Sequence, residues 1–125
     1  MKLKIVSFFA VCLLLFISAC EKEEFRYDLE LLTGTEWGIP QVLETGPSGG
    51  SFIQTSPNVF YEDGRVSFGG SIDFWQVRDS RSLHLQRREQ IWQVLELTEN
   101  KLSVDVLKFP NGDFLFEVDF YPLEE

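Results

Sequence analysis

Few residues of this chain could act as catalytic or metal-binding groups. Histidine occurs once, at His84, and the two cysteines are Cys12 and Cys20. A structural zinc site needs about four ligands of these types, which the chain does not offer. A Ser-His-Asp triad would depend on His84, and no G-x-S-x-G segment marks a nucleophile for it. We therefore expect a protein that is not an enzyme and that holds no metal or other cofactor.

The acidic residues, 20 in number, do not form a recognisable hydrolytic or calcium site. Glu117 and Asp119 alternate with apolar residues, so we expect both on an exposed strand face and not as a paired acid and base. Asp63 and Asp113 lie beside glycines but lack the loop spacing of an EF-hand. They are better explained as turn formers.

By alternation, we expect His84 on the polar face of its strand. Four arginines form the basic cluster of the chain. The cluster consists of Arg78, Arg81, Arg87 and Arg88. We expect these arginines to form solvated pairs with the acidic excess, and contact with an anionic partner is the alternative.

Five aromatic residues are candidates for a binding pocket. An eight-stranded barrel is just wide enough to be filled by side chains or to hold one small ligand. Aromatic rings that point inward would line such a pocket or fill it as a core, and the sequence leaves both open. These residues are Trp37, Phe60, Trp75, Trp92 and Phe116.

The N-terminus has the pattern of an export signal. Lys2 and Lys4 precede an apolar stretch over residues 5–19, which is short for a membrane span and typical of a signal peptide. Residues 17–20 (ISAC) resemble a bacterial lipobox. The resemblance implies cleavage before Cys20 and a diacylglycerol on its thiol, so that the membrane is a partner through the acylated Cys20. A plain secretory signal is the alternative.

The residues that follow Cys20 suggest where the anchored protein goes. Lys22, Glu23 and Glu24 resemble the export signal of surface lipoproteins in some Gram-negative bacteria. The resemblance implies an outer-membrane lipoprotein that is exposed on the cell surface. A solvated tether on a protein that faces the periplasm is the alternative.

Composition limits the chain to one folded domain. Its 125 residues carry a formal net charge of -9, which argues against nucleic acid as a partner. After residue 20 no apolar run approaches the ~20 residues of a spanning helix. We expect a signal peptide over residues 1–19, a lipidated tether and short helix over 20–33, and a β-domain over 34–125.

Short apolar segments separated by turn residues predict an all-β domain. Strands are expected over residues 37–43, 51–54, 58–61, 65–68, 72–77, 83–87, 90–97, 102–107 and 114–121. Alternation in the last strands predicts one dry and one wet face, which is typical of antiparallel sheets. We expect a single meander of about eight strands closed into a small barrel, after a short helical turn over residues 28–32. A β-sandwich is the alternative.

Several motifs resemble those of lipocalin-like domains in bacterial lipoproteins. They are the segments 31–37 (LLTGTEW), 60–66 (FYEDGRV), 73–77 (DFWQV) and 91–102 (IWQVLELTENKL). The resemblance implies a lipocalin-like barrel that begins with a short helix. It suggests a non-catalytic binding module for a small apolar or amphipathic ligand. The alternative is a domain with a filled core that serves as an interaction or accessory subunit through its outer surface.

Overall fold

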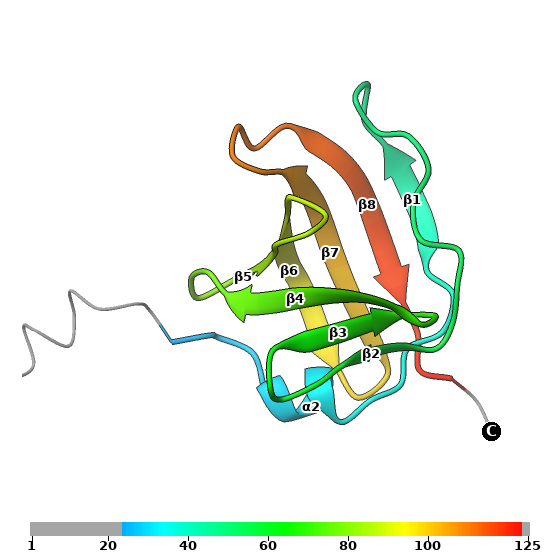
Figure 1. The fold of residues 1–125 in the computed structure, drawn as a ribbon, viewed down its shortest axis with the longest axis vertical. Coiled ribbons are helices and arrows are strands. Elements are labelled where there is room, and N and C mark those ends of the chain that lie inside the picture. Colours follow the sequence, from blue (N-terminus) through cyan, green and yellow to red (C-terminus); the bar gives the residue numbers. More distant parts are fainter. Residues whose placement is uncertain (1–23, 124–125) are drawn as a thin grey trace, which may run out of the picture.

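The computed structural model describes residues 24–123, and these form one strongly curled antiparallel sheet with a short helix at one end (Figure 1). The elements are α2 (Leu29–Thr33), β1 (Gln41–Thr45), β2 (Asn58–Phe60), β3 (Arg65–Phe68), β4 (Ser71–Val77), β5 (Ser82–Leu85), β6 (Gln90–Thr98), β7 (Lys101–Lys108) and β8 (Phe114–Phe120). The all-β, eight-stranded prediction is confirmed.

The strand order is β1-β8-β7-β6-β5-β4-β3-β2, with every neighbouring pair antiparallel. Strands β2 to β8 follow one another as a meander because each connection is a short turn. Glycines with positive φ permit several of these turns. Gly69 (63°) and Gly70 (101°) form the two-residue turn between β3 and β4, and Gly64 (95°) lies between β2 and β3. The first strand pairs with the last, which curls the sheet into a barrel-like shape.

The helical turn α2 is also confirmed. The side chain of Asp28 accepts a hydrogen bond from the backbone N–H of Glu30 (2.9 Å) and so caps the N-terminus. The backbone N–H of Gly34 donates to the carbonyl of Glu30 (2.7 Å) at the C-terminus. Leu32 is fully buried and anchors this single turn against the core.

The barrel closes at one end through the segment around Trp37 and not through direct pairing of β1 with β2. The backbone N–H of Trp37 donates to the carbonyl of Asn58 (2.9 Å), and the N–H of Asn58 donates back (2.7 Å). On its other side, Gly38 donates to the carbonyl of Tyr121 (2.8 Å). This segment therefore bridges the start of β2 and the end of β8.

One predicted strand, over residues 51–54, is a loop. Phe52 and Ile53 are adjacent, and both are buried, at 7% and 6% exposure. Neighbouring residues of a strand point to opposite faces, so only an irregular backbone can send both side chains into the same core. The loop thereby fills the gap where β1 and β2 diverge.

Strand β5 is shorter than predicted and ends at Leu85. The chain turns at once because the buried carboxylate of Asp73 accepts hydrogen bonds from the backbone N–H groups of Arg87 (2.7 Å) and Arg88 (3.1 Å). Glu89 takes a positive φ of 53° in the same turn. Alternation alone could not show this stop.

Candidate functional site

All five aromatic residues predicted as pocket lining or core lie in the hydrophobic core. They come from four strands and from the bridging segment, and their exposed fractions are 9% or less. They are Trp37, Phe60 on β2, Trp75 on β4, Trp92 on β6 and Phe116 on β8. The core therefore receives an aromatic ring from each of β2, β4, β6 and β8, and aliphatic side chains from β5 and β7.

The rings touch one another across the interior. Phe52 lies 5.0 Å from Phe116 and 5.9 Å from Trp92 between ring centroids. Trp92 stacks on Phe120 at 5.4 Å, and Phe60 lies 5.9 Å from Trp92. These separations are those of contacting aromatic pairs. The loop residue Phe52 thus packs on core rings of β6 and β8.

The three indole N–H groups have partners within the protein. Trp37 donates to the carbonyl of Leu32 (3.3 Å), and Trp92 donates to Oε1 of Gln90 (3.1 Å). Trp75 donates to the carbonyls of Tyr61 and Arg65, both at 3.0 Å. Each buried indole is therefore satisfied and has no need of a polar ligand group.

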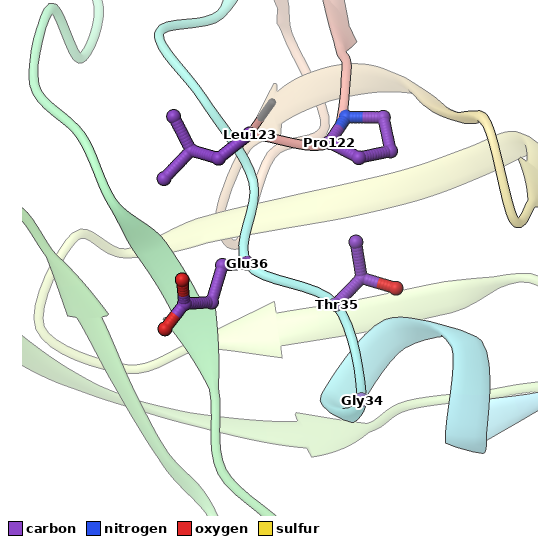
Figure 2. A pocket seen from close by; sticks show the side chains of 5 residues that line it. All are labelled: Gly34, Thr35, Glu36, Pro122 and Leu123. Carbon is purple, nitrogen blue, oxygen red and sulfur yellow. The ribbon is translucent and has the colours of Figure 1, made fainter. Parts of the chain in front are cut away.

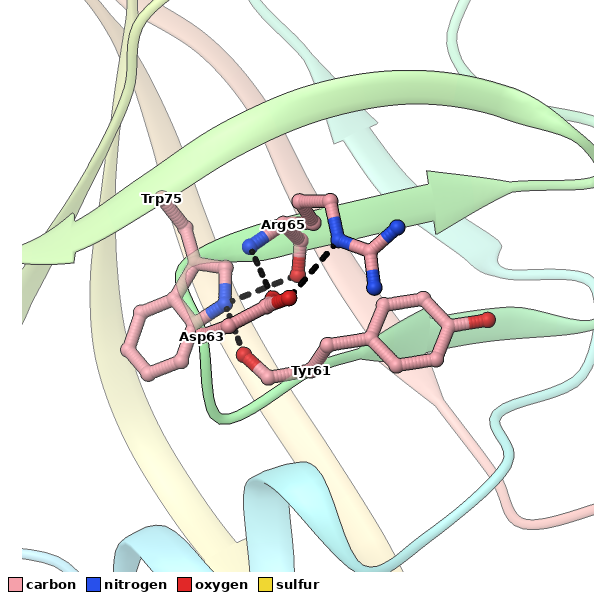
Figure 3. A network of polar contacts seen from close by, with 4 residues as sticks. All are labelled: Tyr61, Asp63, Arg65 and Trp75. Carbon is pink, nitrogen blue, oxygen red and sulfur yellow. Dashed lines mark hydrogen bonds and ion pairs between the residues drawn. The ribbon is translucent and has the colours of Figure 1, made fainter.

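The two carbonyls that accept the indole N–H of Trp75 belong to the β2–β3 turn, which a polar network holds in place (Figure 3). Asp63 accepts hydrogen bonds from the backbone N–H of Arg65 (3.1 Å) and from its Nε (2.9 Å). The backbone N–H of Arg65 is the main reason that the pKa of Asp63 is lowered. The arginine head lies 5.2 Å from the ring centre of Tyr61. Asp63 is a turn former here, and the network positions the two carbonyls that receive Trp75.

A shallow surface depression of about 490 Å³ lies beside the bridging segment (Figure 2). It is lined by Gly34, Thr35, Glu36, Pro122 and Leu123. The carboxylate of Glu36 is the single charged group among these residues. The depression holds no convergent set of polar groups, and none of the five predicted aromatic residues lines it.

The basic cluster has two parts with different surroundings. Arg78 pairs with Asp79 (3.2 Å) near the β4–β5 turn, where both side chains remain about half exposed. Arg88 instead lies with its guanidinium 4.7 Å from the ring centre of Phe68, and burial lowers its pKa. Within the basic cluster, Arg78 therefore forms a solvated pair, as predicted, and Arg88 covers the edge of the aromatic core.

His84 lies on the outer face of β5, where its ring centre lies 4.4 Å from that of Phe109, with the two rings tilted by 32°. Within residues 24–123 there is no group of three or more His, Cys, Asp or Glu side chains that could hold a metal ion.

The prediction that Asp119 is exposed is wrong. It is only 5% exposed on β8, and its carboxylate accepts a hydrogen bond from Ser103 Oγ on the neighbouring strand (2.6 Å). Lys101 Nζ lies 3.5 Å away and the hydroxyl of Tyr121 donates at 3.4 Å. Asp119 raises the pKa of Lys101. Neighbouring side chains therefore bury this acid on the outer face, and strand alternation does not report such cover.

A row of three acids crosses the outer face of β1, β8 and β7. Glu44 lies opposite Glu117, and Glu117 lies opposite Asp105. Burial and, after it, the charge of Glu44 raise the pKa of Asp105. This row could not be predicted from the sequence, because it depends on which strands pair and no local pattern shows that the first strand joins the last.

The membrane signals lie mostly outside the described residues. Cys20, Lys22 and Glu23 precede residue 24, and Glu24 is exposed at the start of the described chain. Among residues 24–123, no helix has the length and apolar character that crossing a membrane requires.

Comparison with known proteins adds nothing to these observations. No protein-family model, no curated protein and no solved structure matches this chain. The site must therefore be interpreted from its own geometry.

Proposed function

We propose that this protein is a lipid-anchored envelope protein that works as a non-catalytic interaction or accessory subunit through its outer surface. The observation that carries the proposal is the position of Phe52. Its ring packs on Phe116 and Trp92 at the centre of the curled sheet. Because this loop residue packs into the interior, we infer that the protein recognises its partner through the outer surface.

The arrangement of polar groups supports the same reading. The indole donors Trp37, Trp75 and Trp92 are all hydrogen-bonded within the protein. The outer surface carries charged groups that a partner could recognise, among them the acid row on β1, β8 and β7 and the arginines near β4 and β5. A ligand site of the usual kind combines a concave apolar wall with a few free polar groups.

A dye assay tests the filled interior against the alternative of a small apolar ligand. An environment-sensitive apolar dye is titrated into the purified protein, in a buffer whose additives are uncharged. Fatty acid is then added as a competitor. The proposal expects no saturable rise in fluorescence. A saturable rise that fatty acid reverses would favour the hollow barrel and reject this proposal.

The anchor is proposed from the sequence, with acylation at Cys20 and attachment to the outer membrane of a Gram-negative bacterium. Cys20→Ser removes the acceptor thiol, so we expect uncleaved precursor and loss of acyl mass. Cys12→Ser is a matched control, since that cysteine lies in the segment that cleavage removes. Intact-mass spectrometry of protein from the native host measures both. Normal acylation of the Cys20→Ser variant would refute the anchor.

Display on the cell surface is proposed from Lys22, Glu23 and Glu24. Replacing all three with alanine is expected to protect the domain from protease added to whole cells, because the export signal is lost. Glu99→Ala, on the exposed β6–β7 turn, is the control. Unchanged digestion of the triple variant would leave the protein's orientation independent of this motif.

A further inference from the structure

The two edge strands of the sheet differ in how they are covered. The edge of β2 is bridged by Trp37 and lies against α2. Strand β1 pairs with β8 on one side. In residues 24–123 its other edge makes no backbone hydrogen bond, although the following loop passes close to the side chain of Thr45 at Gly49. All five residues of β1 are exposed, which holds for no other strand of the described chain.

The direction of the free backbone groups follows from the register. Thr45 lies opposite Phe116, and the backbone N–H of the next residue, Gly46, donates to the carbonyl of Leu115 (2.8 Å). In an antiparallel ladder the residues alternate between bonding to the partner and pointing away from it. The N–H and C=O of Thr45 therefore point to the free edge.

The side chains beside this edge are apolar and acidic. Val42 and Leu43 are 37% and 54% exposed. Glu44 begins the acid row that continues through Glu117 to Asp105. No lysine or arginine of the described residues forms an ion pair with any of these three acids. The ion pairs of the described residues involve Asp63, Asp79 and Asp119 instead.

We propose that the free edge of β1 binds an extended segment of a partner protein with lysine or arginine at alternate positions. This inference rests on the proposed function and names the partner's chemistry. Main-chain hydrogen bonds to an added strand supply affinity, and its alternating side chains supply specificity. Like charges on adjacent strands destabilise a sheet, so a cation laid beside Glu44 relieves a repulsion that the free protein retains.

A second copy of this chain is a poorer occupant. Pairing β1 with its own copy would bring a second Glu44 next to the acid row, between molecules that each carry a net charge of -9. The bulge between Val42 and Glu44 also interrupts the edge. Bulges and short strands limit indiscriminate edge-to-edge assembly, so the edge suits a short segment of matched charge.

The test uses the full chain in uncharged detergent and a fluorescent synthetic peptide in which lysine alternates with valine and threonine. A peptide with glutamate in place of lysine is the control ligand. We expect saturable binding of the lysine peptide alone, weakened by salt because screening shortens the range of charge interactions to about 3 Å at 1 M. Equal binding of the two peptides would overturn the proposal.

Two variants locate the binding site. Glu44→Lys is expected to weaken binding of the lysine peptide about tenfold, while Glu99→Lys on the β6–β7 turn leaves it unchanged. Thr45→Pro removes the outward N–H and is expected to abolish binding without loss of the β-sheet circular dichroism. Equal losses in Glu44→Lys and Glu99→Lys would overturn the proposal, and this pair decides the matter if Thr45→Pro unfolds.

Sedimentation velocity tests whether a second copy of this chain occupies the edge of β1. A dimer of the full chain that Thr45→Pro dissociates would show that a second copy covers the edge, and the proposal would then be wrong. Failure of peptide binding leaves the dye and acylation results unaffected, so it does not reject the proposed function.

Discussion

The buried carboxylate of Asp73 on β4 and the backbone N–H of Arg88 are joined by a hydrogen bond of 3.1 Å across two different hairpins. The same carboxylate accepts from the N–H groups of Arg87 (2.7 Å) and Phe74 (2.6 Å). Hydrogen bonds to a charged acceptor are about twice as strong as neutral ones. Asp73 therefore ends β5 and holds the β5–β6 turn against the sheet.

Asp73→Ala is expected to lower the free energy of unfolding by about 3 kcal/mol, because three backbone donors lose a buried charged acceptor. Urea unfolding followed by tryptophan fluorescence measures the change. Asp113→Ala, on the exposed β7–β8 turn, is the control and is expected to have a small effect. A loss below about 1 kcal/mol for Asp73→Ala would mean that water replaces the carboxylate.

Local patterns in the sequence predicted most of the sheet. Asn111-Gly112 and Asp63-Gly64 marked turns, and the alternation from Phe114 to Phe120 marked the last strand. Contacts between distant residues could not be predicted in this way. The burial of Asp119 depends on Ser103 and Lys101, and the entry of Phe52 into the core depends on the gap between β1 and β2.

Phe52→Ala tests the filled interior from the opposite direction. Removing a buried phenylalanine costs about 3–5 kcal/mol and leaves a cavity, here between Phe116 and Trp92. We expect lower stability together with new uptake of apolar dye that the parent protein lacks. Tyr61→Ala removes an exposed ring as the control. Loss of stability without dye uptake would indicate that the core collapses around the missing ring.

Trp92→Ala is expected to be among the most destabilising single changes in the domain, at about 3–5 kcal/mol. The indole is fully buried and contacts rings from β2, β3, β8 and the 46–57 loop. Thermal unfolding followed by circular dichroism measures the effect. A neutral result would contradict the inward position of this side chain.

The Trp75 hydrogen bonds can be tested with little change in packing. Trp75→Phe retains an aromatic ring and removes the donor that reaches the carbonyls of Tyr61 and Arg65. Both carbonyls keep a backbone partner in the β2–β3 hairpin, so we expect a loss of about 1.5 kcal/mol. Denaturant unfolding of Trp75→Phe and of Asp63→Asn would show whether the turn network of Figure 3 and the indole act together. Additive effects of the double variant would mean that they do not.

The acid row predicts a pH-dependent cost to stability. Burial and the charge of Glu44 raise the pKa of Asp105 in the folded state, so the folded protein binds a proton more readily than the unfolded chain. The contribution of Asp105 to the free energy of unfolding therefore falls as the pH rises from below the pKa of the unfolded chain to above the raised pKa of the folded state. At neutral pH Asp105→Asn is expected to increase the free energy of unfolding by about 0.5 kcal/mol, since solvent screens the repulsion.

Urea unfolding of Asp105→Asn and of the parent at several pH values measures this cost. The gain is expected to disappear below about pH 3, where the carboxyl is protonated in both states. Glu99→Gln, on an exposed turn, controls for the change in net charge. Glu44→Gln should give part of the same gain, because it removes the neighbouring charge. A gain in stability that is constant with pH would mean that the packing of the new amide causes it. The electrostatic repulsion from which a cationic partner of β1 was inferred would then be absent.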